Sequence, residues 1–254
     1  MRVHAVSDVH VDYDLNARWI SALSRQDYTD DVLILAGDVS DDLSRLRWCL
    51  TDLSGRFRKV VFVPGNHDLW VMRDDRRITS FEKLDLVRKV ASDCGVSTAP
   101  HEEVGLSVLP ILSWYDFSFG QPSADLRRVW ADFTACRWPS GIDEEAITTR
   151  FLAETCDGAQ GSIGRDVITF SHFVPRRDLL PWFPGRESLN LLPVLGTGRI
   201  DTKLRSLGAV VHVYGHSHVN RRAVIDGVTY VNSALGYPQE TAISERRLRC
   251  VYER

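Results

Sequence analysis

Short apolar runs and helical patterns alternate along most of the chain. The runs are rich in β-branched residues and apolar at both alternate positions, as in strands that are covered on both faces. A further apolar stretch, 106–112, indicates an additional strand. The five runs that predict buried strands are residues 3–6, 32–36, 60–63, 167–170 and 210–214.

Between these runs, apolar residues recur at the spacing of one helix face. Residues 43–53 carry leucine at four such positions, and residues 81–91 show the same pattern. Gly95 then suits the cap that follows the second helix. Strands that alternate with helices predict an α/β fold.

The last third of the chain predicts antiparallel strands. Residues 221–225 and 228–232 flank Asp226-Gly227, a strong signal for a two-residue hairpin. Residues 247–252 have the pattern of a final strand. We therefore expect mixed sheets rather than purely parallel ones.

Residues 114–164 have a different pattern of apolar and polar residues, which predicts a helical insertion. Two helical stretches, Ala124–Cys136 and Glu144–Cys156, are separated by Trp138-Pro139-Ser140-Gly141. We expect the whole chain, residues 1–254, to form a single domain, with this insertion near the active site. Trp130, Trp138 and Trp182 could form a lid over that site or anchor the insertion.

Acid, amide or imidazole groups directly follow each of the five predicted buried strands. In open α/β sheets, ligands bind beyond the carboxyl ends of the strands, where all of these groups would lie. Five of the eight histidines fall in these segments, which predicts a single polynuclear metal centre. The segments are Asp8-Val9-His10, Gly37-Asp38, Gly65-Asn66-His67-Asp68, Ser171-His172 and Gly215-His216-Ser217-His218.

The donors in these segments indicate which metals to expect. Carboxylate, amide and imidazole together suit Mn, Fe, Co, Ni or Zn better than Mg or Ca, which prefer oxygen alone. One ion cannot use all seven donors and still hold a substrate, whereas two ions that share one carboxylate can. Such a pair, about 3.5–4 Å apart, can clamp a phosphoryl group and activate water. The seven are Asp8, His10, Asp38, Asn66, His172, His216 and His218.

The ordered set of motifs closely resembles the calcineurin-like metallophosphoesterases. It runs Asp-x-His, Gly-Asp, Gly-Asn-His-Asp, His and Gly-His-x-His over residues 6–218. The resemblance implies a four-layer α-β-β-α sandwich with two mixed central sheets and a metal site at the carboxyl ends of the strands. It also implies that Asp38 bridges the ions, one held by Asp8, His10 and His218 and the other by Asn66, His172 and His216.

The resemblance also implies roles for residues around the metals. His67 matches a histidine that binds no metal, contacts the scissile phosphate and protonates the leaving oxygen. That role suits imidazole, which titrates near neutral pH. Asn66 and Asp38 would join it as catalytic residues, and Asp41 and Asp68 match positions where carboxylates orient ligands.

Departures from the family pattern narrow the substrate class. The protein serine/threonine phosphatases carry Gly-Asp-x-Val-Asp-Arg-Gly and Gly-Asn-His-Glu. This chain has Gly37-Asp38-Val39-Ser40-Asp41-Asp42 and Gly65-Asn66-His67-Asp68 instead. It also lacks the basic surface expected of the DNA-repair nucleases in the superfamily.

Substrate contacts are less well specified than the metal ligands. Trp70, Trp114 and Tyr115 follow predicted strands and could stack on an organic group, although ordinary packing would explain them equally. Arg176 and Arg177 could bind a second anionic group or form a solvated helix start.

Composition excludes several other classes of protein. A net charge of −3 argues against long nucleic acid as the main partner. The five scattered cysteines argue against a disulfide framework. No apolar stretch approaches the roughly 20 residues of a membrane span. Since the first strand begins almost at the N-terminus, we expect a cytoplasmic protein rather than a secreted one.

We therefore expect a metal-dependent phosphoesterase, either a phosphatase or a phosphodiesterase, with two divalent ions, of which Mn would serve best in vitro. A hydroxide that bridges the metals would attack a small phosphate monoester or a nucleotide-type phosphodiester. Two alternatives stay open, a nuclease that acts on polymeric nucleic acid and a non-catalytic scaffold of the same fold. The sequence does not indicate the substrate or the oligomeric state.

Overall fold

The computed structural model describes residues 1–74, 77–155, 165–181 and 189–254, and the strands in these ranges form two sheets. The smaller sheet has the order β10-β1-β2-β3 and the larger one β4-β5-β6-β7-β9-β8. The first sheet contains β1 (Arg2–Val6), β2 (Val32–Ala36), β3 (Lys59–Val63) and β10 (Arg249–Glu253). The second contains β4 (His101–Glu103), β5 (Leu106–Pro110), β6 (Asp166–Phe170), β7 (Val211–Tyr214), β8 (Arg221–Ile225) and β9 (Val228–Asn232).

Both sheets are mixed, as the sequence predicts. In the first sheet β1, β2 and β3 are parallel, and β10 pairs antiparallel with β1. In the second, β5, β6, β7 and β9 are parallel, while β4 and β8 add antiparallel strands at the two edges. The predicted hairpin is formed by β8 and β9, with Ile225 opposite Val228.

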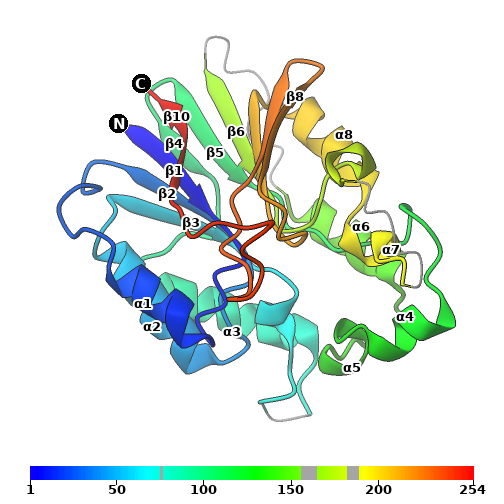
Figure 1. Ribbon diagram of the computed structural model, residues 1–254. Helices are drawn as coiled ribbons and strands as arrows, with labels where there is room; N and C mark the ends of the chain where they lie inside the picture. The colour runs from blue at the N-terminus through cyan, green and yellow to red at the C-terminus, as the bar shows by residue number, and fades with distance from the viewer. Residues whose placement is uncertain (75–76, 156–164, 182–188) are drawn as a thin grey trace.

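Helices cover the outer faces of the two sheets and complete the four-layer sandwich that we expected. Figure 1 shows α1, α2 and α3 on one side of the molecule and α6, α7 and α8 on the other. The helices are α1 (Asp14–Ser21), α2 (Leu43–Ser54), α3 (Ser80–Asp93), α4 (Ala124–Val129), α5 (Asp132–Ala135), α6 (Glu144–Ala153), α7 (Leu192–Leu195) and α8 (Gly198–Ser206). Two short 3₁₀ turns are η1 (His67–Leu69) and η2 (Arg177–Leu179).

Strand β2 shows why the predicted strands are apolar at both alternate positions. Its five side chains are all fully buried. Leu33 and Leu35 pack in the core that includes residues of α2 and α3, whereas Val32, Ile34 and Ala36 pack in the core shared with the second sheet. Successive side chains of a strand point to opposite faces, so a strand between two buried layers must be apolar throughout.

The helices begin with side-chain caps that the sequence supplies. Asp42 accepts hydrogen bonds from the backbone N–H groups of Ser44 and Arg45 at the start of α2. Thr79 and Glu82 form a capping box at the start of α3. Each cap satisfies backbone N–H groups that the first turn of a helix leaves unpaired. These contacts explain why α2 and α3 begin within one residue of their predicted positions.

The predicted insertion helix over residues 124–136 is wrong as a single helix. The chain forms α4 and α5 instead, with Trp130 between them in an extended conformation (ψ 119°). The side chain of Asp132, the first residue of α5, accepts hydrogen bonds from Trp130 and from residues of the metal-site loop, contacts that spacing alone does not reveal. The second helix, α6, ends at Ala153, and the predicted end at Cys156 lies outside the described residues.

The two ends of the chain lie side by side, because β10 pairs with β1. The Met1 amino group donates to the carbonyl oxygen of Arg254 at 3.1 Å. Among the helices of the described ranges, none is long and apolar enough to span a membrane.

Candidate metal centre

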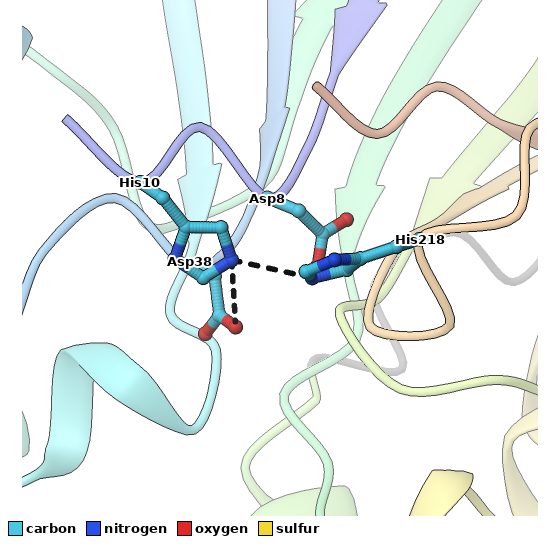
Figure 2. Close-up of side chains that lie close together, drawn as sticks. All are labelled: Asp8, His10, Asp38 and His218. Carbon is cyan, nitrogen blue, oxygen red and sulfur yellow. Dashed lines mark hydrogen bonds and ion pairs between the residues drawn. The ribbon is translucent and has the colours of Figure 1, made fainter. Parts of the chain in front are cut away.

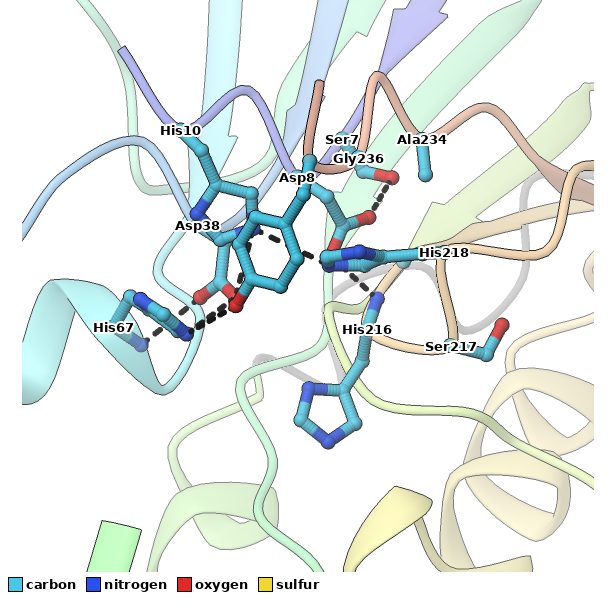
Figure 3. A network of polar contacts seen from close by, with 12 residues as sticks. Ser7, Asp8, His10, Asp38, His67, His216, Ser217, His218, Ala234 and Gly236 are labelled. Carbon is cyan, nitrogen blue, oxygen red and sulfur yellow. Dashed lines mark hydrogen bonds and ion pairs between the residues drawn. The ribbon is translucent and has the colours of Figure 1, made fainter. Parts of the chain in front are cut away.

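The loops after five strands converge at one edge of the sandwich and bring the predicted metal ligands together. Asp8 and His10 follow β1, and Asp38 follows β2. Figures 2 and 3 show these side chains and that of His218, from the loop after β7, pointing toward one another. All seven predicted ligands are at most 8% exposed, although each is polar. Burial on this scale is unfavourable unless the polar groups have partners.

Five of the seven predicted ligands have left-handed backbone conformations. The φ angles are 50° for Asp8, 41° for His10, 56° for Asp38, 64° for His216 and 53° for His218. Such angles are uncommon for residues with a side chain, and they concentrate at functional sites. Neighbouring loops hold the first turn in place, since the backbone N–H of Asp8 donates to Gly37 and that of His10 to Asp38, each at 2.9 Å.

The first group of possible ligand atoms comes from Asp8, His10, Asp38 and His218. One ligand atom from each lies within 4.8 Å of the others. Nε2 of His10 is 3.2 Å from Nε2 of His218, which is 3.3 Å from Oδ1 of Asp8. Figure 2 shows His10 between His218 and Asp38, whose Oδ2 is 3.9 Å from Nε2 of His10.

The second group consists of Asp38, His172 and His216, with Asn66 beside it. Nε2 of His172 is 3.1 Å from Nδ1 of His216, 3.4 Å from Oδ1 of Asp38 and 3.0 Å from Oδ1 of Asn66. Asp38 belongs to both groups, with one oxygen toward each. The family resemblance implies the same division of ligands between two ions, and that division stays a prediction.

The carboxylates of the buried cluster favour positive charge beside them. Burial disfavours imidazolium, but Asp38 and Asp8 raise the pKa of His172 to about 9, and Asp8 and Glu240 raise that of His218 to about 10. Burial and the charge of His172 lower the pKa of His216 to about 3. The ring whose pKa is raised thus lies beside a ring whose pKa is lowered in each half of the cluster. Two divalent ions could bind the ring nitrogens that face the cluster and both carboxylates, so the residues fit a dinuclear centre.

Hydrogen bonds behind the three second-sheet histidines orient their rings toward the cluster. Nδ1 of His172 donates to the carbonyl of Ala36 and Nε2 of His216 to that of Val194, each at 3.0 Å. Nδ1 of His218 lies 2.5 Å from Oε2 of Glu240. These partners accept, so the opposite ring nitrogen is free for a metal, as in many metal sites.

Asp68, for which the resemblance implies a role in orienting ligands, is a fully buried carboxylate beside the cluster. It accepts hydrogen bonds from the backbone N–H groups of Asp38, Val39, Ser40 and Gly65, at 2.8–3.1 Å. It thereby ties the loop after β2 to the loop after β3. Burial and the charge of Asp38 raise the pKa of Asp68 to about 7, while the N–H groups oppose this shift.

Asp41 makes different contacts from those that we expected. Its Oδ2 pairs with Nε of Arg73 at 2.9 Å, and its backbone carbonyl accepts from Nζ of Lys83 at 2.7 Å. Asp41 therefore fixes the segment after Trp70 rather than the ring of a predicted ligand.

His67 lies at the open side of the cluster, with its side chain 18% exposed. Its backbone N–H donates to Oδ1 of Asp38 at 2.9 Å, and its Nε2 is 3.9 Å from Oδ2 of the same carboxylate. Trp70 stacks on the imidazole, with ring centroids 3.6 Å apart. Nε2 of His67 thus lies on the side of the ring near the shared carboxylate.

Of the possible substrate contacts, only Trp70 touches this site. Trp114 and Tyr115 are each 1% exposed and pack in the hydrophobic core, which favours a structural role. Arg176 pairs with Asp178 at 2.7 Å and with Asp201 at 3.1 Å, and Arg177 is exposed in η2.

Three residues near the cluster were not predicted from the sequence: Asp132, Tyr237 and Glu240. The hydroxyl of Tyr237 is 3.4 Å from Nε2 of His67, and its ring packs against those of His10 and His218. The loop of Tyr237 and Glu240 follows β9 as the other site loops follow their strands, and Gly236 was the available signal. No sequence signal marked Asp132, because it lies in a segment that resembles a continuous helix.

A model of the calcineurin-like phosphoesterase family matches residues 1–220. The chain belongs to this family. As a member with the metal-ligand groups in place, it is a metal-dependent phosphoric ester hydrolase, which sets aside the non-catalytic scaffold.

Within the family the chain is similar to a phosphodiesterase from Mycobacterium tuberculosis (strain ATCC 25618 / H37Rv). That protein, the acyl-carrier-protein phosphodiesterase PptH, is 30% identical over 93% of this chain and 78% of its own length. The crystal structure of the M. tuberculosis phosphopantetheinyl hydrolase PptH superposes with a TM-score of 0.79 and 28% identity. The match covers 98% of this chain and 95% of that one.

Proposed function

We propose that this chain is a dinuclear metal phosphodiesterase that releases a phosphopantetheinyl group from a carrier protein. The observation that carries the proposal is its likeness to PptH, at 30% identity over 93% of this chain. A phosphopantetheinyl group held by a phosphodiester is a protein-borne substrate, which differs from the small free ester that the sequence led us to expect.

The proposed centre divides the predicted ligands between two ions of Mn, Fe, Zn, Co or Ni. Asp8, His10 and His218 would hold one, Asn66, His172 and His216 the other, and Asp38 both. When bound, the ions would activate water and neutralise charge on the phosphoryl oxygens. A mixed set of nitrogen and oxygen donors supports borderline metals over Mg or Ca.

The protein's own residues position the ester and complete the proton transfer. An oxygen of water forms a bond to phosphorus, and the bond from phosphorus to the carrier's oxygen breaks. The proton that the water loses replaces the one that His67 gives to that leaving oxygen. Because an alkoxide is a poor leaving group, His67 donates a proton to that oxygen as it departs. The Tyr237 hydroxyl, 3.4 Å from Nε2 of His67, lies where it can hold this ring toward the leaving group.

Exposed apolar side chains near the site support a protein substrate. Tyr13 is 40% exposed, and its ring centroid is 5.5 Å from that of Tyr237. Met72 is 52% exposed and follows Trp70 by two residues. A carrier that delivers its prosthetic arm to the metals would cover such a rim, whereas a small ester would leave it in water.

No observation favours the nuclease alternative. In the described part of the chain, Arg73 beside the site and Arg176 after the His172 loop both pair with aspartates. With a net charge of −3, the chain offers little attraction to a long polyanion.

The decisive experiment incubates the Mn-loaded protein with a phosphopantetheinylated carrier protein and follows the carrier's mass. Loss of the phosphopantetheinyl group would support the proposal. We expect His67→Ala to lower the rate roughly 10²–10⁴-fold. Asp125→Asn, at an exposed position of α4, is the matched control and should leave the rate unchanged. Hydrolysis of bis-p-nitrophenyl phosphate with an intact carrier would refute the carrier as substrate while retaining the phosphodiesterase.

A further inference from the structure

Asp132, at the start of α5, is a buried carboxylate next to the candidate centre. It is 3% exposed and lies in the insertion, far in sequence from the metal-site loops. Its Oδ1 accepts from Nδ2 of Asn66 at 2.8 Å and from Nε1 of Trp70 at 2.7 Å, and its Oδ2 accepts from Nε1 of Trp130 at 2.8 Å. All three of these N–H donors are neutral, and the hydroxyl of Tyr115 also bonds to the carboxylate, so Asp132 is held by directed hydrogen bonds.

The bond to Asn66 determines which way its amide faces. A side-chain amide has one accepting oxygen and one donating NH₂, and either could point at the cluster. Because Asp132 can only accept when ionised, it takes the NH₂ and leaves Oδ1 of Asn66 facing His172 at 3.0 Å. An amide ligates a metal through its oxygen, so this is the orientation that ligation requires.

The bond to Trp70 fixes the ring beside His67. With the indole N–H held by Asp132, the ring stacks on the imidazole at a centroid distance of 3.6 Å and an interplanar angle of 28°. The same oxygen of Asp132 therefore orients a candidate metal ligand and supports the histidine beside the cluster. Trp130, on the other oxygen, connects this arrangement to the end of α4.

We propose that Asp132 is a positioning residue for both halves of the site. It holds the oxygen of Asn66 toward the second metal and holds His67 through Trp70, so that the insertion helps to assemble the centre. This inference rests on the proposed metal centre and does not depend on which phosphodiester is the substrate.

The test compares Asp132→Ala, Asp132→Asn and the double variant Asp132→Asn/Trp130→Phe. Alanine removes all three acceptor contacts. Asparagine keeps one oxygen for Asn66 and Trp70 but turns its NH₂ toward the indole N–H of Trp130, leaving two donors face to face. Phenylalanine at 130 removes that conflict. Asp125→Asn, in the neighbouring helix and with its side chain 67% exposed, is the control.

Metal affinity is the first readout. Metal-stripped protein is titrated with Mn²⁺ in a calorimeter, and near-UV circular dichroism of the stripped variants checks their folding. We expect Asp132→Ala to weaken one of two binding events by roughly 10–100-fold, as for other residues that orient ligands. Asp132→Asn should lose less Mn²⁺ affinity than Asp132→Ala, and the double variant should regain part of the affinity that Asp132→Asn loses.

The kinetic readout uses bis-p-nitrophenyl phosphate at saturating Mn²⁺. Once excess metal fills both sites, a residual fall in kcat with little change in KM would report the loosened His67.

The variants separate the possible outcomes. Wild-type Mn²⁺ binding and wild-type kcat in folded Asp132→Ala would overturn the proposal. If Asp132→Ala does not fold, the comparison of Asp132→Asn with Asp132→Asn/Trp130→Phe decides. The same Mn²⁺ affinity in the wild type and in both of these variants would also overturn the proposal. Wild-type protein that binds Mn²⁺ twice but leaves the carrier intact would refute only the carrier substrate.

Discussion

At the scale of single residues, the site depends on side chains that fix the direction of each donor. His218 faces the cluster with Nε2, because its Nδ1 contacts Glu240 at 2.5 Å. Glu240 also accepts from the backbone N–H of Tyr237 at 2.8 Å. It therefore orients a candidate ligand and anchors the loop that places the phenol beside His67.

Replacement of Glu240 by alanine should weaken metal binding at the site of His218. Loss of the carboxylate frees the imidazole to rotate and lowers its basicity, so we expect a roughly 10–100-fold fall in Mn²⁺ affinity, measured by calorimetry. Glu245→Ala, whose side chain is 59% exposed in the same region, is the control. Unchanged affinity in Glu240→Ala would mean that its contact with His218 does not support a ligand.

Gly37 is required where the loop after β2 passes the second-sheet histidine. It has φ +84°, and a Cβ there would lie 2.5 Å from Nδ1 of His172. Gly141 has a similar φ, +83°, but open space around it. Alanine at either position carries the strain of a left-handed backbone, about 1–2 kcal/mol. Only at Gly37 does it also collide with the site.

Gly37→Ala should therefore lose more stability than Gly141→Ala. We expect both variants to unfold at a lower urea concentration than the wild type, with the larger shift and a loss of Mn²⁺ binding at Gly37 alone. Equal shifts with intact metal binding would contradict the close approach between these loops.

The histidines and aspartates of the candidate centre could be singled out from sequence because each lies just after a strand. The continuous apolar run 32–36 predicts a buried strand, and Gly37-Asp38 lies directly after its end. Asp132 and Glu240 could not be predicted in this way. They reach the cluster through tertiary contacts. Gly236 after β9 marks only the loop that carries Glu240, and nothing in the local sequence distinguishes Asp132 from a solvated acid.

At the scale of elements, the loop before β2 is joined to β1 by a buried carboxylate. Asp31, 3% exposed, accepts from the backbone N–H of Arg2 at 2.7 Å and from its Nε at 2.9 Å, and lies 3.1 Å from Nε2 of His4. Burial alone would raise the pKa of Asp31, but these donors lower it below its usual value. The two parallel strands thus share a charge-assisted contact at their amino ends.

Asp31→Asn should destabilise the protein in a pH-dependent way. A carboxyl group whose pKa is lowered by folding adds stability above its unfolded pKa, about 3.9, and loses it as pH falls through the folded value. We expect a loss of roughly 1–3 kcal/mol at pH 7 that shrinks below about pH 4. Urea titrations of the metal-stripped proteins measure the difference, and a gap that widens in acid would contradict the assignment.

The predicted elements differ in how completely local sequence defines them. β2, β8 and β9 have the predicted bounds, because apolar periodicity and the Asp226-Gly227 turn are local signals. α8 was not predicted, since it opens at Gly198 and carries few apolar residues. The break between α4 and α5 depends on hydrogen bonds to Asp132, which no helical periodicity contains.

At the scale of the whole molecule, the candidate centre joins the two sheets. Asp8 and Asp38 come from the first sheet, and His172 and His216 from the second. The first sheet also contributes to both hydrophobic cores, and β10 returns the end of the chain to β1. On these grounds we propose that residues 1–254 form one domain, with bound metal acting across the sandwich.

Metal removal should therefore lower the stability of the entire chain. A ligand at 1,000 times its Kd adds about 4 kcal/mol to the folded state. In a chain of this size that corresponds to a rise in Tm on the order of 10 °C. We expect one cooperative calorimetric transition that shifts down by this amount in chelator. Two separate transitions would contradict the single domain, and an unchanged Tm would mean that no metal is held between the sheets.

The most direct test of the central claim is a titration of metal-stripped protein with Mn²⁺ during cleavage of a phosphopantetheinylated carrier protein. The two ligand groups that share Asp38 predict that activity will rise until two equivalents of Mn²⁺ are bound per chain and then level off. Cleavage that is unaffected by Mn²⁺, or that saturates at one equivalent, would contradict a dinuclear phosphodiesterase.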